Sequence, residues 1–232
     1  MVKNKYRYEY KYLVSESQIK YLETQIKRIM KPDPNAIDGT YRIRSLYFDD
    51  YYDSGYYSVE NGEDYREKLR IRIYNASNSR ISLECKAKTN SKTQKSSTII
   101  SKEDCKSLMS KKAIRNSKDP LINKMNSKIL INDLKPSIIV EYDRKPYIYK
   151  EGNVRVTFDT NISSSNYINN FFDKRIVRRP IMPKGMHILE VKYDDFLPDI
   201  IYQTLNISKL QQISFSKYYL CRNIDIGNKF RR

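Results

Sequence analysis

Cationic and apolar side chains alternate with a period of two in several segments of this chain. The clearest case is residues 66–74, REKLRIRIY, with cations at Lys68, Arg70 and Arg72 and apolar residues at Leu69, Ile71 and Ile73. Because successive side chains of a β-strand point to opposite faces, the three cations would lie side by side on one face. The segment therefore predicts a strand with one apolar face and one positively charged face.

The alternation recurs, which predicts a fold dominated by antiparallel strands. We expect strands within residues 5–14, 41–50, 66–74, 80–88, 137–149, 154–162, 186–193 and 212–220. Three of these segments contain Glu-x-Lys, at Glu9 and Lys11, Glu84 and Lys86, and Glu190 and Lys192. In a strand, each such glutamate shares a face with its lysine.

Helical segments interrupt the strands. Ser15 with Gln18 is a capping-box signal ahead of an apolar stripe, and prolines follow at 32 and 34. Ser101 and Asp119 are predicted caps of two further helices, within 102–110 and 120–130. We also expect a helix within 197–205, whereas residues 47–57 are interpreted as a strand end and a turn. The combination predicts an α+β fold.

Composition indicates the kind of partner and the compartment. The chain has 44 Lys and Arg against 27 Asp and Glu, a formal net charge of +17, which favours an anionic partner. Its three cysteines form no CxxC or Cys/His cluster, and no stretch approaches the roughly 20 apolar residues of a membrane span. We therefore expect a cytoplasmic protein with one domain, residues 1–232.

The charged strand faces have two interpretations. The first is an antiparallel sheet with one face in water, where mixed charges are common. The second is a closed β-barrel with the charged faces lining its lumen and helices packed outside. Two like charges about 4 Å apart repel by about 4 kcal/mol at an effective dielectric near 20, so such a lumen would require a polyanion. Glutamates among the cations would suit Mn²⁺ or Mg²⁺, which binds carboxylates together with phosphate oxygens.

The order of short motifs along the chain resembles a known family. The motifs are YKYLV, SLYFDD, KLRIRIY, LECKAK, QKSS, VEYDR, RVTFDT, LEVKY and SKY, from about Tyr6 to Tyr219. In this order they resemble the VTC domain, the polyphosphate polymerase module of the triphosphate tunnel metalloenzyme (CYTH-like) superfamily, and the chain looks like a bacterial stand-alone member. The resemblance implies a closed antiparallel β-barrel, a tunnel with a polar, basic lumen that binds ATP or another triphosphate and a growing chain of inorganic polyphosphate.

The resemblance also implies site residues. The predicted catalytic residues are Arg70, Arg72, Lys86, Arg155 and Lys217. The predicted substrate-binding residues are Lys11, Lys95, Arg144, Lys192 and Ser216. Glu190 matches the metal-binding glutamate of the family, and Glu9 and Glu84 are the further predicted ligands of Mn²⁺ or Mg²⁺.

One departure bears on the activity. Tunnel triphosphatases and class IV adenylyl cyclases begin with Glu-x-Glu-x-Lys, whereas this chain has Arg7, Glu9 and Lys11. Losing the first carboxylate favours the polymerase branch over metal-assisted hydrolysis. The alternatives are a module that binds polyphosphate or triphosphate without turnover, a tunnel triphosphatase, and a nucleic-acid-binding protein. We expect no specific nucleic acid partner, because no nucleic-acid-binding motif is found; a membrane-protein partner in the cell is left open.

Overall fold

The computed structural model describes residues 7–36, 38–89 and 92–229. Within them the chain divides into two compact units, each with its own apolar core. Unit 1 consists of residues up to Arg42 together with Tyr142–Ile162 and Met182–Phe215, and unit 2 consists of Ile43–Glu141, Ser163–Ile181 and residues from Ser216 onward. The strands β3, β7 and β8 contribute residues to both units.

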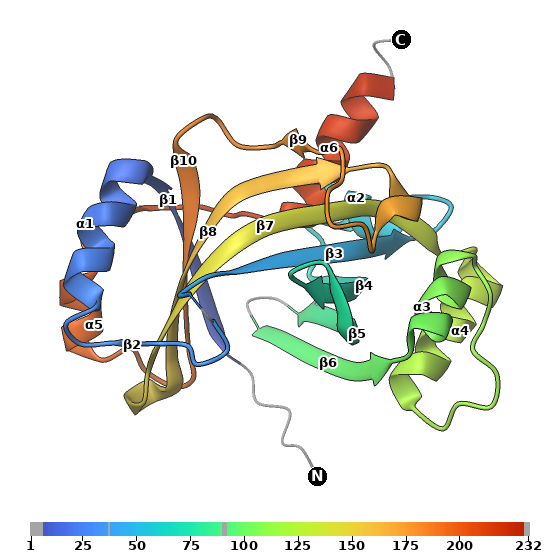
Figure 1. Cartoon of the computed structure of the whole chain (residues 1–232), viewed down its shortest axis with the longest axis horizontal. Coiled ribbons are helices and arrows are strands. Elements are labelled where there is room, and N and C mark those ends of the chain that lie inside the picture. The colour runs from blue at the N-terminus through green and yellow to red at the C-terminus, as the bar shows by residue number, and fades with distance from the viewer. Residues whose placement is uncertain (1–6, 37, 90–91, 230–232) are drawn as a thin grey trace. The chain divides into compact units, whose positions relative to one another are not determined.

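The described residues form eleven strands (Figure 1). They are β1 (Tyr8–Ser15), β2 (Lys31–Pro32), β3 (Tyr41–Asp49), β4 (Tyr65–Tyr74), β5 (Ser77–Thr89), β6 (Lys92–Ile100), β7 (Lys135–Tyr149), β8 (Val154–Ser165), β9 (Arg179–Pro180), β10 (Met186–Tyr193) and β11 (Gln211–Gln212). Their hydrogen-bonded order is β11-β1-β10-β8-β7-β3-β4-β5-β6, with β2 on β7 and β9 on β8.

The sheet confirms the predicted α+β class and the antiparallel strands. The pairings of β1 with β10, of β10 with β8, and of β3 through β6 are all antiparallel. The strand order ends at β11 and at β6, and no strand pairing among the described residues closes the sheet into a barrel. Lys5 and Tyr6 of the first predicted strand lie outside the described residues, and the strand begins at Tyr8.

Six helices occur in the part of the chain that the structure describes. They are α1 (Glu16–Ile26), α2 (Ser54–Glu60), α3 (Lys102–Met109), α4 (Pro120–Asn132), α5 (Asp199–Thr204) and α6 (Lys217–Lys229), with 3₁₀ turns at Glu151–Asn153, Ile168–Asn170 and Ile207–Lys209. The predicted caps are confirmed: Ser15 and Gln18 form both bonds of a capping box, and Ser101 and Asp119 accept backbone N–H groups of α3 and α4. No helix among these residues is long and apolar enough to span a membrane.

The core of unit 1 lies between the apolar faces of its strands and two helices. Its strand residues come from β1, β7, β8 and β10, for example Val14, Tyr147 and Val191, and its helix residues from α1 and α5. Figure 1 shows α1 and α5 side by side, and residues of the two helices are in contact. Because alternate residues of these strands enter the core, their remaining side chains, including Lys11 and Glu190, lie on the opposite face.

The core of unit 2 follows the same plan. Leu69, Ile71 and Ile73 of β4 are buried with apolar residues of β3 and β5, and they pack with α3 and α4. Cys85 belongs to this core, where burial raises the pKa of its thiol to about 11, as expected of a packing residue. The cations of β4 therefore lie on the face opposite the core, as the alternation predicts.

Two local predictions are wrong. The strand predicted over 212–220 is only the two-residue β11, and the chain then enters α6. The Ser216 hydroxyl accepts the N–H of Tyr219, and Tyr218, Cys221 and Arg222 are buried at helical spacing, which overrides the β preference of the tyrosines. Residues 47–57 do end a strand, but α2 begins at Ser54, because Asp49 accepts the N–H groups of Gly55 and Tyr56.

Candidate functional site

The polar face of unit 1 has carboxylates and cations in alternating positions on neighbouring strands. On β1 and β10, Glu9 lies opposite Lys192 and Lys11 opposite Glu190. On the far side of β10, Lys192 lies opposite Arg155 of β8. Each acidic position therefore has a lysine directly across the strand pair, which partly offsets the repulsion among the cations.

Lys192 links the two glutamates of this face. Its ammonium lies 2.6 Å from Glu190 Oε1 and 3.5 Å from Glu9 Oε2. Burial disfavours the charged ammonium, but Glu190 and Glu9 outweigh burial and raise the pKa of Lys192. Lys11 contacts the same cluster, with Nζ 3.0 Å from Glu9 Oε1, and donates to the carbonyl oxygen of Phe215 at 2.8 Å.

Arg144 on β7 is held by a buried acid. Its Nε and Nη2 donate to Oδ1 and Oδ2 of Asp159, both at 2.7 Å, and Nη2 lies 3.5 Å from Glu190 Oε1. Burial would lower its pKa, but Asp159, Tyr142 and Glu190 more than compensate and raise it. Arg144 is thus fixed as a cation in contact with the Glu9, Glu190 and Lys192 cluster.

Arg155 has a separate set of contacts in unit 1. Its Nη2 lies 2.6 Å from Oδ2 of the buried Asp33 and donates to the Tyr41 hydroxyl at 2.7 Å. About a third of its side chain is exposed. The guanidinium is therefore oriented by the protein and still accessible to an anion.

In unit 2, three predicted cations surround one buried carboxylate. Glu84, which is 2% exposed, accepts from Arg70 Nε at 2.8 Å and from Lys95 Nζ at 2.7 Å, and its Oε2 lies 3.7 Å from Arg72 Nε. Burial alone would raise its pKa, but the three cations hold the pKa of Glu84 well below its usual range. Tyr47 orients Arg70 further, by accepting a hydrogen bond from Nη1 at 2.8 Å.

Lysines gather next to this carboxylate on the same strand faces. Lys68, Lys86 and Lys95 lie directly opposite one another across β4, β5 and β6. Lys68 donates to the hydroxyl of Ser216 at 2.7 Å, and Ser216 precedes Lys217, the first residue of α6. This end of the face thus has closely spaced cationic positions, a pattern that suits a polyanion.

The structure therefore divides the predicted site residues between two clusters. Unit 1 holds Glu9, Lys11, Arg144, Arg155, Glu190 and Lys192; unit 2 holds Arg70, Arg72, Glu84, Lys86, Lys95, Ser216 and Lys217. In each unit these residues lie on the polar strand faces or at the start of α6. Their roles in binding and catalysis stay predictions.

Sequence reasoning missed the residues that orient the cations. Asp159 holds Arg144, Asp33 holds Arg155, and Tyr47 holds Arg70. The alternation could have placed Asp159 on the polar face of β8, because it follows Arg155 and Thr157 at a spacing of two. No such pattern could have indicated Asp33, since it lies between two prolines outside any alternating segment.

Glu9 and Glu190 are the carboxylates that fit a divalent cation. They come from paired strands, and both contact the ammonium of Lys192, so the position between them already holds a positive charge. Mg²⁺ and Mn²⁺ accept one or two carboxylates with water or phosphate oxygens completing the shell. Within the described residues no group of three or more His, Cys, Asp or Glu suited to a metal is found. At Glu84, a metal ion would have to compete with three cations.

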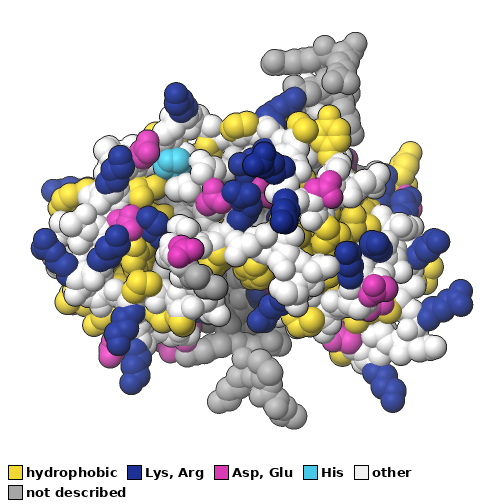
Figure 2. All heavy atoms as spheres, in the orientation of Figure 1, with side chains coloured by type: hydrophobic (Ala, Val, Ile, Leu, Met, Phe, Trp, Pro, Cys, Tyr) yellow, Lys and Arg dark blue, Asp and Glu magenta, His cyan; other side chains and the backbone are white. Residues whose placement is uncertain are grey.

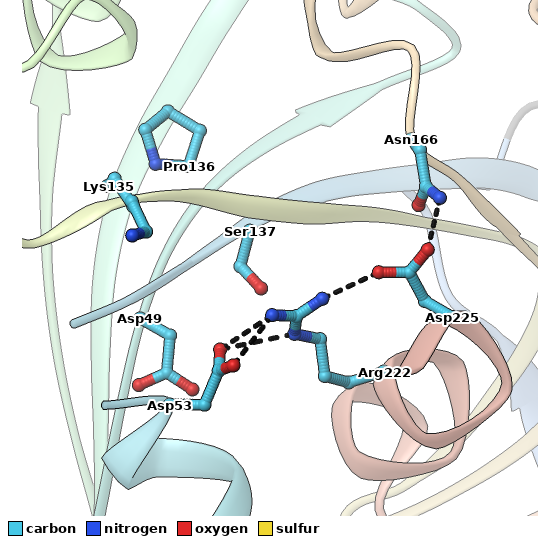
Figure 3. A pocket seen from close by; sticks show the side chains of 8 residues that line it. All are labelled: Asp49, Asp53, Lys135, Pro136, Ser137, Asn166, Arg222 and Asp225. Carbon is cyan, nitrogen blue, oxygen red and sulfur yellow. Dashed lines mark hydrogen bonds and ion pairs between the residues drawn. The ribbon is translucent and has the colours of Figure 1, made fainter. Parts of the chain in front are cut away.

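A polar cavity in unit 2 involves none of the predicted site residues. It measures about 240 Å³ and is lined by Asp49, Asp53, Lys135, Pro136, Ser137, Asn166, Arg222 and Asp225 (Figure 3). Arg222 donates to both carboxylate oxygens of Asp53, at 2.7 and 2.8 Å, and to Asp225 at 2.6 Å. The pair with Asp53 ties α6 to the residue that precedes α2, and the pair with Asp225 lies within α6, so the charges lining the cavity anchor a helix.

The surface also bears on the nature of the partner. On the face shown in Figure 2, Lys and Arg side chains are spread over the surface with acidic side chains among them. A nucleic-acid-binding surface usually presents a basic patch or stripe. On this face the densest group of Lys and Arg side chains, at the upper centre, has acidic side chains beside it.

The family is settled by comparison of the sequence with family models. The VTC domain model matches residues 6–224, nearly the whole chain. This chain belongs to the VTC domain family. The resemblance of the motifs to the VTC domain is thereby confirmed.

Solved structures share the fold of this VTC chain at low sequence identity. The adenylyl cyclase candidate HpAC1 from Hippeastrum, described as having a dominant triphosphatase activity, has a TM-score of 0.57 at 13% identity, with 94% of this chain and 95% of that chain covered. An adenylate cyclase candidate from Bacillus halodurans has a TM-score of 0.54 at 16% identity, covering 90% and 95%. One from Vibrio parahaemolyticus has 0.53 at 11%, covering 94% and 98%. No curated protein gives a significant sequence match.

Proposed function

We propose that this VTC chain is a polyphosphate polymerase, which transfers the γ-phosphate of ATP or another triphosphate to a growing chain of inorganic polyphosphate. The observation that supports this most is the match of the VTC model to residues 6–224, together with cations fixed on the polar strand faces of both units. The proposal includes two features of the fold. The sheet closes into a basic tunnel with helices outside, and the whole chain forms a single tunnel domain.

The residues of the proposal act by positioning and charge. Arg70, Arg72, Lys86, Arg155 and Lys217 would stabilise the negative charge of the transferred phosphoryl group, and Lys11, Lys95, Arg144, Lys192 and Ser216 would bind other phosphates. Glu190 and Glu9 would hold Mn²⁺ or Mg²⁺, which when bound neutralises phosphate oxygens. Phosphoryl transfer asks mainly for alignment and electrostatic stabilisation, which such a set supplies.

The reaction needs no nucleophilic side chain. A terminal oxygen of polyphosphate attacks the γ-phosphorus, the new P–O–P bond forms, and the bond from the γ-phosphorus to the bridging oxygen of ADP breaks. The attacking oxygen is already anionic near neutral pH, so no protein group has to remove a proton. The cations hold both chains against their mutual repulsion.

The contacts of Arg7 favour transfer over hydrolysis. At this position tunnel triphosphatases carry a carboxylate, whereas here Arg7 Nε lies 2.8 Å from Asp194 Oδ1. The cation is therefore engaged in an ion pair, and no third metal-binding carboxylate stands at this position. This supports the polymerase over the triphosphatase.

The test is a product analysis. The full chain is incubated with ATP and Mn²⁺, with and without a short polyphosphate primer, and the products are separated on a urea gel. A ladder of phosphate chains that a polyphosphate-specific phosphatase removes is the expected result. Release of free phosphate without chain growth would instead indicate a triphosphatase, and tight binding of tripolyphosphate without turnover would indicate a binding module.

The nucleic-acid alternative is tested by competition. Labelled RNA should be displaced from the protein by short polyphosphate if both bind only to cations of the strand faces. Tight binding of RNA that polyphosphate does not displace would contradict the proposal. We expect displacement, because phosphate groups without bases satisfy the same cations.

A further inference from the structure

Thr157 on β8 has a buried hydroxyl that no described residue satisfies. The residue is 1% exposed, and its Oγ1 has no hydrogen-bond partner among the described residues. Its neighbours Val156 and Phe158 are in the core of unit 1, so the side chain of Thr157 lies on the opposite, polar face. There it stands directly across from Glu190 of β10.

A hydroxyl in this position requires a polar partner. Leaving a buried donor and acceptor unsatisfied costs free energy, and native proteins nearly always satisfy such groups with protein or water. The guanidinium of Arg144, next to this position, donates to Asp159 on the same strand as Thr157. No described residue bonds the Thr157 hydroxyl, so a water molecule or a bound group can take that place.

The ammonium of Lys192 occupies the adjacent position. It contacts Glu190 and Glu9, and about a quarter of its side chain is exposed. A lysine is a flexible point charge, so its ammonium can leave two carboxylates when a cation of higher charge arrives. A divalent ion of the Mn²⁺ or Mg²⁺ class keeps several water ligands, and these waters donate hydrogen bonds to nearby oxygens.

We infer that a hydrated divalent cation displaces the Lys192 ammonium from between Glu9 and Glu190, and that the Thr157 hydroxyl accepts a hydrogen bond from one of its waters. The displaced ammonium is then available to a phosphate oxygen, so that metal and phosphate bind together. The inference rests on the proposed function only for the class of metal; its test needs neither ATP nor turnover.

The test measures Mn²⁺ binding to the full chain without nucleotide. Free Mn²⁺ is counted from its electron paramagnetic resonance signal, and thermal unfolding is followed at the same Mn²⁺ concentrations. Thr157→Val removes the hydroxyl at nearly constant volume, and Thr157→Ser is the matched control that keeps it. Lys192→Gln removes the competing charge, and Glu190→Gln removes a ligand.

The variants should change the affinity for Mn²⁺ in opposite directions. Thr157→Val should weaken Mn²⁺ binding about tenfold, because a water bound to the metal loses its hydrogen-bond partner, while the melting temperature of the variant without metal stays equal or rises. Thr157→Ser should bind like the wild type. Lys192→Gln should bind Mn²⁺ severalfold more tightly, because no ammonium competes, and Glu190→Gln should lose most binding.

Failure of the inference and failure of the function are distinguishable. If Glu190→Gln loses Mn²⁺ but Thr157→Val and Lys192→Gln bind like the wild type, the inference is wrong and the metal-dependent function stands. Weaker binding by Lys192→Gln would also overturn it, because the lysine would then support the site. If the wild type binds no Mn²⁺ even with tripolyphosphate present, the inference fails together with the metal part of the proposed function.

Discussion

Arg144 and Asp159 form a two-pronged ion pair with both bonds at 2.7 Å, and Asp159 is completely buried. The pair joins β7 to β8 within unit 1 and fixes the guanidinium 3.5 Å from Glu190. Removing one partner of such a pair leaves the other as an uncompensated charge in a place of low dielectric.

Asp159→Asn should therefore destabilise the protein strongly. We expect a loss of about 3–5 kcal/mol in the free energy of unfolding, measured by urea denaturation. Asp143→Asn is the control, because Asp143 pairs with Arg42 at 3.2 Å on the surface of the same unit and should cost at most about 1 kcal/mol. Equal losses of unfolding free energy in the two variants would show that the buried pair stabilises the protein no more than the surface pair.

Glu84 competes with phosphate for three cations. Glu84→Gln should lower the stability of the ligand-free protein by about 3 kcal/mol, because Arg70, Arg72 and Lys95 lose their counter-charge. The same change should increase the stabilisation by tripolyphosphate, measured as the shift in unfolding free energy. Glu141→Gln removes a buried acid that pairs with Arg44 and Arg178, and it should destabilise without that increase. A smaller tripolyphosphate response in Glu84→Gln would contradict this competition.

Arg70 should contribute directly to phosphate binding. At 100 times its dissociation constant, tripolyphosphate should add about 2.7 kcal/mol to the stability of the wild type. Arg70→Ala should weaken affinity about tenfold and leave roughly half of that shift at the same concentration, since a hydrogen bond to a charged group contributes about 1.5–3 kcal/mol. Lys112→Ala, which removes an exposed charge after α3, should respond like the wild type. An unchanged response in Arg70→Ala would remove Arg70 from the site.

Glu23 should make the stability of unit 1 depend on pH. Burial opposes ionisation, but Lys27, Tyr147 and Lys145 hold the pKa of Glu23 at about 2. The pKa of Glu23 in the folded protein is below the ordinary value of about 4.3. The ionised carboxylate therefore stabilises the fold above about pH 5, and this stabilisation disappears as the pH falls toward 2. Allowing for solvent screening, the contribution is on the order of 1–2 kcal/mol.

The pH effect is checked by denaturation between pH 3 and pH 7. Glu23→Gln should flatten the acid side of the stability profile relative to the wild type. Glu103→Gln, which removes an exposed carboxylate at the start of α3, should keep the wild-type profile. If both variants keep it, Glu23 is not a source of the acid sensitivity.

Local sequence patterns predicted most of the longer strands and helices. Alternation placed the cations of β4 opposite Leu69 and Ile71, and capping signals at Ser15, Ser101 and Asp119 located the starts of three helices. These features depend on neighbours within a few residues. The start of α6 at Lys217 was missed, because the burial of Tyr218 and Cys221 at helical spacing depends on residues distant in the chain.

The side chains that share a strand face follow from the period of two, because that period is fixed by the strand backbone. Together with the order of the sequence motifs, this was enough to identify the VTC family. Three features became visible only in the folded chain: Asp159 pairs with Arg144, Glu84 pairs with three cations, and Thr157 has no hydrogen-bond partner among the described residues. Such contacts join strands far apart in sequence, and their distances depend on sheet register and burial.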